Sequence, residues 1–151
     1  MKPDYARKLL EESLGELAKA RGHLDYSFKE IAGLPATLAG ATERQLESAE
    51  AFTGRFARAV DLLVNKVLRS LDRVEMQPEG TLLDVVNRAE KRGFVGRAQE
   101  LREMKDVRNI IAHDYAGAKA AEIFNYCRDQ KPLVDSIFDA VAKYSATALK
   151  R

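Results

Sequence analysis

Two long stretches of the chain repeat apolar residues every three, four or seven positions, and this feature constrains the fold most. The first stretch extends from about Pro3 to Ile31, and its apolar members are Leu9, Leu10, Leu14, Leu17, Leu24, Phe28 and Ile31. The second extends from about Thr42 to Val74, and its members are Phe52, Phe56, Val60, Leu63, Val67, Leu71 and Val74. This spacing places the apolar side chains on one face of an α-helix. Because only about ten residues, rich in helix breakers, separate the stretches, the sequence predicts two long antiparallel helices.

Capping residues predict where helices begin and end. Thr42 is followed three residues later by Gln45, which matches a capping box and places the start of the second long helix there. After a loop at residues 76–80, Thr81 is expected to cap a short third helix that ends near Gly93.

Two further helices complete the predicted bundle. One covers about Val95–Tyr115 and stops before Gly117, and the other covers about Ala118–Leu149. Pro132 is expected to kink this last helix or to split it in two. No stretch alternates between apolar and polar residues as a β-strand does. The expected fold class is therefore all-α, an up-and-down bundle of about five helices in one domain of residues 1–151.

Charge, cysteine content and hydropathy narrow the functional classes. The formal net charge is only +2, so the molecule as a whole is not a basic surface for nucleic acid. The single cysteine, Cys127, can form no disulfide within the chain. No apolar run approaches the roughly 18 residues of a membrane span, and the first residues lack the apolar core of a secretory signal. We therefore expect a cytoplasmic protein with no membrane association.

The segment from Val107 to Gly117, VRNIIAHDYAG, concentrates side chains that carry chemistry. Within eight positions stand Arg108, Asn109, His113, Asp114 and Tyr115. A histidine has an ordinary pKa of about 6.5, so it can take or give a proton at neutral pH. An arginine stays charged and can hold a phosphate and its developing negative charge. These side chains suit the cleavage of RNA, in which the ribose 2′-OH attacks the phosphate without help from a metal.

Helix geometry separates the two main groups of this segment. At about 100° per residue, the buried direction of the motif helix is defined by Met104, Val107 and Ile111. Arg108 and Tyr115 share a stripe beside that direction, whereas His113 lies nearly opposite it. Either the helix distorts near its end, or a second subunit completes the site. Ile110 lies beside His113 on the face turned away from the core, and this favours the second subunit.

Ordinary structural roles are open for the same residues. His113 can stabilise the C-terminus of its helix through the helix dipole. Arg108 can pair with a neighbouring carboxylate, and Tyr115 can be a core residue with a solvated hydroxyl. Asp114 either acts on the adjacent histidine or caps the backbone locally. Basic residues before the motif either form a solvated surface or contact RNA phosphates; they are Arg55, Arg58, Arg69, Arg73, Lys91, Arg92, Arg97, Arg102 and Lys105.

The segment Arg108–Tyr115 resembles the hallmark motif of the HEPN superfamily, which reads Arg, a polar residue that is often Asn, three further positions, His, any residue and Tyr. The HepT-like branch of this superfamily carries the motif late in a small all-α protein. Residues 49–69 resemble the long aromatic and basic second helix of that branch. Residues 81–95 resemble the short helix and turn that precede its motif helix. The resemblance thus spans roughly residues 45–117.

The resemblance implies a metal-independent ribonuclease that needs no cofactor and forms a homodimer in which the motif helices face one another. Carried onto this chain, Arg108 and His113 are catalytic. Asn109 is a supporting polar residue, and Tyr115 is a modification site. Asp114 occupies the variable position of the motif, and we expect a supporting role for it as well. In the HepT-like branch the partner is a minimal nucleotidyltransferase, an antitoxin that silences the toxin by transferring AMP to the motif tyrosine.

The function we expect is therefore that of an endoribonuclease toxin in such a pair, with RNA as its substrate. An alternative from another class is a non-catalytic subunit that presents a substrate or target to a separate nucleotidyltransferase. A third possibility is a structural helical dimer without any chemistry. The intact set of Arg108, His113 and Tyr115 favours the enzyme, because a scaffold has no need of the histidine.

Overall fold

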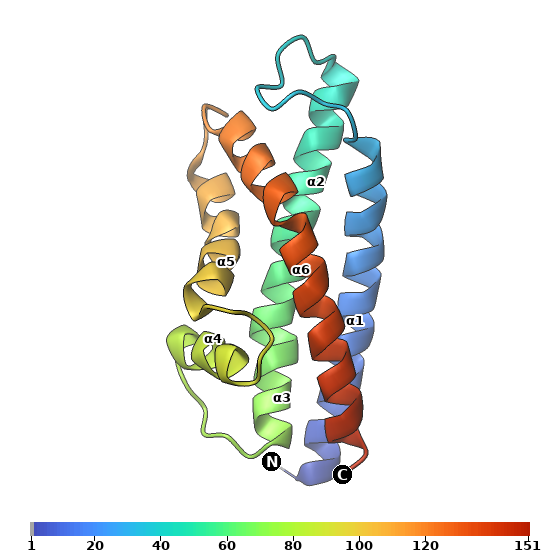
Figure 1. Ribbon diagram of the computed structural model, residues 1–151, viewed down its shortest axis with the longest axis vertical. Coiled ribbons are helices and arrows are strands. Elements are labelled where there is room, and N and C mark those ends of the chain that lie inside the picture. The colour runs from blue at the N-terminus through green and yellow to red at the C-terminus, as the bar shows by residue number, and fades with distance from the viewer. Residues whose placement is uncertain (1) are drawn as a thin grey trace.

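A computed structural model describes residues 2–151, and that part of the chain is built from helices without a β-strand (Figure 1). In chain order the elements are α1 (Pro3–Glu30), α2 (Glu43–Leu62), the π-helical segment η1 (Leu63–Leu68), α3 (Arg69–Val74), α4 (Leu82–Lys91), α5 (Ala98–His113) and α6 (Ala120–Leu149). The elements α2, η1 and α3 follow one another without a break and form a single rod, so residues 2–151 contain five helices. The predicted all-α bundle is confirmed.

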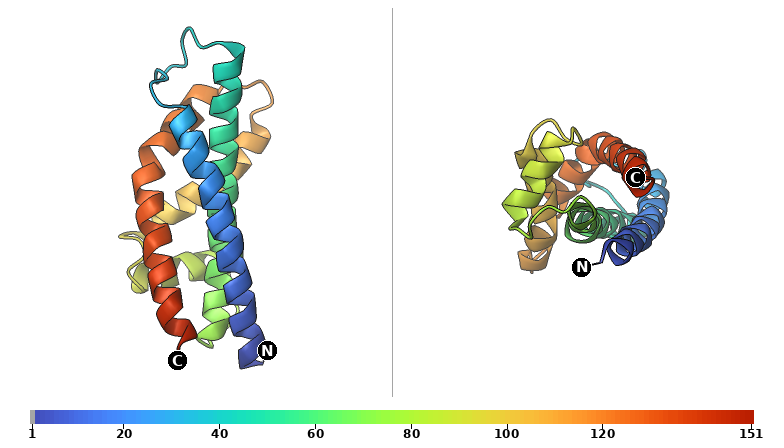
Figure 2. Two further views of the ribbon diagram at one scale, coloured as in Figure 1. Left: turned by 90° about the vertical axis from the view of Figure 1, so that its right-hand side faces the viewer. Right: turned by 90° about the horizontal axis from the view of Figure 1, so that it is seen from below.

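The rod of α2, η1 and α3 is the centre of the bundle. It contacts α1 along its length, and its α2 portion also contacts α5 and α6. Seen from below, α1 lies on one side of the rod, and α4 and α5 lie on the other (Figure 2). Because α1 and the rod run in opposite directions, the predicted antiparallel pair is confirmed (Figure 1). The motif helix α5 therefore packs against the α2 portion of the central rod.

Local capping interactions begin α2 and α4 as the sequence predicts. The backbone N–H of Gln45 donates to the Thr42 hydroxyl over 3.1 Å, and the side-chain oxygen of Gln45 accepts from the Thr42 N–H over 2.9 Å. Thr81 and Asp84 form the same reciprocal pair at the start of α4. After α4, Gly93 adopts a left-handed conformation with φ of 85°, which a residue with a Cβ rarely adopts. These ends are set by residues close in sequence.

Three helix boundaries around the motif differ from the prediction. The motif helix begins at Ala98 rather than Val95 and ends at His113 rather than Tyr115. Val95 is buried in the connection that follows α4. At the other end, Gly117 has φ of 69° inside a short loop, so α6 begins at Ala120 rather than Ala118. The motif tyrosine consequently lies in a loop and not on a helix.

Of the two outcomes expected at Pro132, a kink or a split, the split does not occur. Helix α6 continues without interruption from Ala120 to Leu149 and curves along its length (Figure 2). Proline in a helix interior removes one backbone hydrogen bond and costs about 3 kcal/mol. Pro132 itself is exposed, while its neighbours Val134 and Ile137 are buried against the rest of the bundle. The burial of this helix outweighs the local cost, so the helix is not split.

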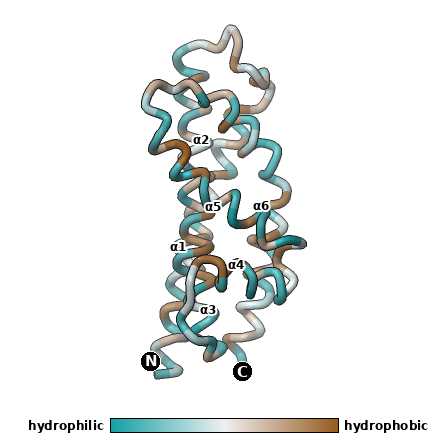
Figure 3. The backbone as a smooth tube through the Cα atoms, turned by 90° about the vertical axis from the view of Figure 1, so that its left-hand side faces the viewer, coloured by the Kyte–Doolittle hydropathy of each residue, from teal (hydrophilic) through white to brown (hydrophobic). Residues whose placement is uncertain are grey.

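The core is drawn from every helix of the bundle. Its aromatic centre includes Phe52, whose ring lies 5.8 Å from that of Phe28 and 6.1 Å from that of Phe124. From α5, the core receives Leu101, Met104 and Val107. Hydrophobic and hydrophilic stretches alternate along the helices on the α4–α5 side, as expected of helices with one buried face (Figure 3). Burial of that face anchors the motif helix.

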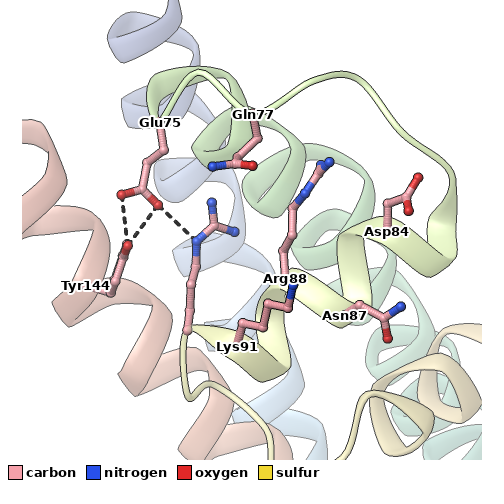
Figure 4. Close-up of a pocket in the computed structure, with 8 residues that line it drawn as sticks. Glu75, Gln77, Asp84, Asn87, Arg88, Lys91 and Tyr144 are labelled. Atoms are coloured by element: carbon pink, nitrogen blue, oxygen red, sulfur yellow. Dashed lines mark hydrogen bonds and ion pairs between the residues drawn. The ribbon is translucent and has the colours of Figure 1, made fainter.

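A buried ionic network, which the sequence pattern did not predict, ties α4 to the rod. The Asp72 carboxylate accepts from Arg88 over 3.1 Å and from Arg92 over 2.7 Å. Glu75 pairs with Arg92 over 2.9 Å and accepts from the Tyr144 hydroxyl over 2.8 Å (Figure 4). A groove of about 660 Å³ lies over this network. Because its acidic and basic side chains already pair with one another, we interpret the network as structural. It holds α4 against the rod and thereby positions the start of α5.

Candidate active site on the motif helix

Arg108 projects from α5 toward α2 and meets an acidic residue there. Its guanidinium donates from NH1 to Oδ2 of Asp61 over 2.9 Å. Oδ1 of the same carboxylate lies 3.1 Å from Nζ of Lys105 and accepts from the side-chain amide of Asn65 over 2.9 Å. Asp61 is 21% exposed, whereas Arg108 is 65% exposed. The motif arginine is thus held at its tip and remains open to solvent.

A groove of about 360 Å³ opens between α2 and α5 beside this pair. Its lining residues are Gly54, Ala57, Arg58, Asp61, Leu62, Arg108 and Ile111. The groove is open because Gly54 has no side chain and Ala57 has only a methyl group. Arg58 and Arg108 border it with two guanidinium groups. A guanidinium binds phosphate oxygens through paired N–H donors. The groove therefore has the chemistry of an anion site at the arginine end of the motif.

His113 is the last residue of α5 and is exposed. Within residues 2–151 its ring has no hydrogen-bond partner, so both ring nitrogens face solvent. The neighbouring Asp114 has a different task, because its Oδ2 accepts from the backbone N–H of Lys119 over 2.9 Å. Of the two roles left open for Asp114, the structure supports the local cap, which closes the loop between α5 and α6.

The remaining motif residues are also open to solvent. Tyr115 is 90% exposed, which excludes the interpretation of this residue as part of the core. Asn109 donates from its side-chain amide to Asp106 over 3.2 Å on the outer face of α5. An aromatic ring with so little packing contributes almost nothing to stability. Its position suits recognition or modification better than a structural role.

The structure does not bring Arg108 and His113 together within one chain. Helix α5 keeps its α-helical pattern as far as His113, so the alternative in which the helix end distorts is wrong. Five positions along an α-helix correspond to about 140° of rotation and about 7.5 Å of rise. Arg108 accordingly faces α2, whereas the histidine faces solvent. Within one chain, Arg108 and His113 therefore lie on different faces of α5.

Two predicted orientations near the motif are corrected by the tertiary packing. Ile111, expected to be buried, is 36% exposed at the groove beside α2. Ile110, expected to face away from the core, is half-buried and packs against it. Ile110 lines a groove of about 270 Å³ together with Ile123 and Tyr126 of α6. The predicted common stripe of Arg108 and Tyr115 is also wrong, because the helix ends before the tyrosine.

About half of the basic residues in question have structural partners. Arg55 donates to the Ser27 hydroxyl over 2.7 Å, and Arg69 donates to the Gly80 carbonyl over 2.9 Å. Arg97 pairs with Glu100 at the start of α5, and Arg92 and Lys105 belong to the ion pairs described above. The exposed ones without an ion pair among residues 2–151 are Arg58, Arg73, Lys91 and Arg102. Of these, only Arg58 borders the groove next to Arg108.

Other candidate groups have no catalytic setting. Cys127 is fully buried, and burial raises the pKa of its thiol to about 12, so it is not a reactive nucleophile. His23 is exposed on α1. Residues 2–151 hold no group of three or more His, Cys, Asp or Glu side chains arranged as metal ligands. Among the same residues, no helix combines the length and the apolar character that crossing a bilayer requires.

Comparison with known proteins identifies the family. No curated protein and no solved structure matches the chain. Residues 28–141 match the family model described as ribonuclease HepT-like. This region extends from the end of α1 into α6 and includes the rod, the groove and the whole motif. The chain therefore belongs to the ribonuclease HepT-like family of the HEPN superfamily.

Proposed function

We propose that the chain is the endoribonuclease toxin of a toxin–antitoxin pair, and that it cleaves RNA at a site shared by two copies of the chain. One observation carries this proposal: Arg108, His113 and Tyr115 are all exposed at the same end of α5, yet the arginine and the histidine face different directions. Side chains built only for packing would be covered. Side chains of a site contained in one chain would face one another.

In the proposed reaction, one histidine takes the proton of a ribose 2′-OH. The 2′ oxygen then bonds to the phosphorus, and the bond from phosphorus to the 5′ oxygen breaks. A second His113, from the other subunit, protonates the departing 5′ oxygen. The products are a 2′,3′-cyclic phosphate and a 5′-hydroxyl end. A positioned acid or base of this kind typically accelerates the reaction by about 10² to 10⁴.

Arg108 stabilises the negative charge that develops on the phosphate oxygens. Its guanidinium is charged at every relevant pH and is already oriented toward the groove. Because side chains of the two subunits supply the base, the acid and the phosphate-binding guanidinium, this reaction requires no metal. The requirement for a 2′-OH also makes RNA the substrate and excludes DNA.

The second subunit is the proposed source of the second histidine. Ile111 is the large apolar side chain beside the motif that a contact through α5 would cover, because it is 36% exposed. In a twofold-symmetric dimer the same patch meets itself, so each chain contributes the same residues to the site. A homodimer through α5 would therefore supply two copies of Arg108 and His113.

Tyr115 is the proposed site at which a nucleotidyltransferase antitoxin attaches AMP. Its hydroxyl lies on a 90% exposed side chain in a loop, where another enzyme can reach it. The attached AMP would place a negatively charged phosphate two residues from His113. That charge and its bulk would compete with RNA for the arginine side of the site. The modification would thus silence the toxin without changing its fold.

The test compares the wild type with His113→Ala, both purified without a partner, on mixed RNA in the presence of EDTA. Cleavage by the wild type alone, with 2′,3′-cyclic phosphate ends, is the expected result. His23→Ala is the matched control, because it removes an equally exposed histidine from a distant helix. Mass spectrometry must first establish that Tyr115 is unmodified in the wild-type sample. If neither protein cleaves RNA, the ribonuclease proposal is wrong, and the non-catalytic binding subunit becomes the better interpretation.

A further inference from the structure

We propose that Asp61, on α2, is a positioning residue that fixes the motif arginine for phosphate binding. This inference rests on the proposed ribonuclease function and extends it to a residue outside the motif. Asp61 is separated from Arg108 by 47 positions in sequence, and their side chains meet over 2.9 Å. The carboxylate acts through Arg108 rather than on the RNA itself.

The contacts of Asp61 distinguish it from an ordinary surface ion pair. Isolated exposed pairs contribute roughly 0–1 kcal/mol, because solvent screens them and both side chains lose freedom. Here one carboxylate receives donors from Arg108, Lys105 and Asn65. It is 21% exposed, and Lys105 is 17% exposed. Each donor restricts the carboxylate, so the carboxylate in turn restricts the guanidinium.

The backbone beneath Asp61 is also firmly held. The preceding Val60 and the nearby Leu63 are buried in the core, and the π-helical segment η1 begins at Leu63. π-Helical turns within α-helices are frequent at functional sites. Asp61 is therefore presented to α5 from a part of the rod that cannot shift without disturbing the core.

The charge balance leaves Arg108 able to bind an anion. One carboxylate faces the two cationic groups of Lys105 and Arg108, so the cluster carries a net positive charge. Only NH1 of Arg108 is used by Asp61, and the guanidinium has further N–H donors. Arg58 adds another cation across the groove. Asp61 thus fixes the direction of the guanidinium without neutralising the site.

The test compares Asp61→Asn with Glu16→Gln. The control removes the same kind of charge from another ion pair between helices, which joins Glu16 of α1 to Lys66 of the rod at 3.0 Å. We expect Asp61→Asn to lower kcat about tenfold or more, with KM changed by less than about threefold, because misplacement of a catalytic group costs rate. Glu16→Gln should leave both values unchanged. Asp61→Glu, which keeps the charge, should recover part of kcat.

Two other outcomes would overturn the proposal. If Asp61 only repelled RNA, Asp61→Asn would lower KM and leave kcat unchanged. If Asp61 only stabilised the fold, the lost activity would match the lost fraction of folded protein in a thermal melt, and KM would stay the same after correction.

A readout independent of cleavage separates this inference from the proposed function. The Nε–H signal of Arg108 in a nitrogen-15 NMR spectrum, assigned by its loss in Arg108→Lys, reports how mobile the guanidinium is. We expect a restricted signal in the wild type and in Glu16→Gln, and a mobile one in Asp61→Asn. Restricted motion without RNA cleavage would uphold the positioning and refute the ribonuclease. Cleavage with an equally mobile Arg108 in the wild type and Asp61→Asn would refute the positioning alone.

Discussion

Mixed dimers of wild-type and His113→Ala subunits would test whether one active site needs two chains. On the regular helix α5, Arg108 and His113 point about 140° apart. One chain therefore offers the arginine toward the groove and the histidine toward solvent, and the proposed reaction uses a histidine from each subunit. In random mixing, the share of dimers with two intact histidines is the square of the wild-type fraction. An equal mixture should then retain about a quarter of the wild-type activity.

The assay needs only exchange of subunits and a cleavable RNA. The two proteins are unfolded together in urea, refolded at a series of ratios, and their initial rates are measured with a fluorogenic RNA in EDTA. His23→Ala replaces His113→Ala in a parallel series, and its mixtures should show no loss at any ratio. Differently tagged subunits, captured in sequence, establish that mixed dimers have formed.

A linear decline would refute this reasoning. If each chain held a complete site, an equal mixture would retain about half of the activity, and the rate would follow the wild-type fraction directly. The difference between a quarter and a half exceeds the error of initial-rate measurements. A linear result would mean that one active site does not need a His113 from each subunit, and it would refute the two-histidine reaction.

Three further predictions follow from single side chains. Tyr115→Phe should fold as the wild type does and should be cleavage-competent, but it should resist silencing by a nucleotidyltransferase with ATP, as read by the mass of the protein. Asp72→Ala should destabilise the protein by about 3–5 kcal/mol in urea unfolding, because it leaves the largely buried Arg88 guanidinium without a counter-charge and leaves Arg92 with Glu75 alone; Asp139→Ala, which breaks an exposed pair, should cost less than about 1 kcal/mol. Hydrogen bonds from Thr81 hold the pKa of Asp84 below its usual range, so its contribution to stability is present above the ordinary Asp pKa of about 3.9 and is lost as the pH falls through the lowered value. Asp84→Asn should reduce the pH dependence of the melting temperature in that acid range. Near neutral pH this pH dependence should be the same as in the wild type.

Prediction from sequence succeeded where the deciding interactions are local. The capping box of Thr42 and Gln45 spans three residues, and so does the pair of Thr81 and Asp84. The apolar stripes of the two long helices report burial directly, because each helix needs one covered face. The motif residues Arg108 and His113 can also be found by residue type and spacing, and their catalytic roles stay a prediction.

Prediction failed where a neighbouring helix decides the environment. Ile110 and Ile111 are adjacent and chemically identical, and only the course of α6 determines that Ile110 is covered and Ile111 is not. Pro132 is a helix breaker in isolation, and the packing of α6 overrides it. Helix α5 ends at His113, two residues earlier than predicted, because Asp114 caps the loop that follows.

The sequence by itself determined the helical class, most helix ends and the choice of candidate site residues, because these depend on residue type and on contacts within a few positions. Only the tertiary structure decided which groups meet. It joined Asp61 to Arg108 across 47 positions, and it joined Asp72 to Arg92 across 20. It also showed that one chain leaves Arg108 and His113 apart. The physical reason is that such pairs depend on how whole helices pack, and packing is settled by the summed burial of many side chains rather than by any local pattern.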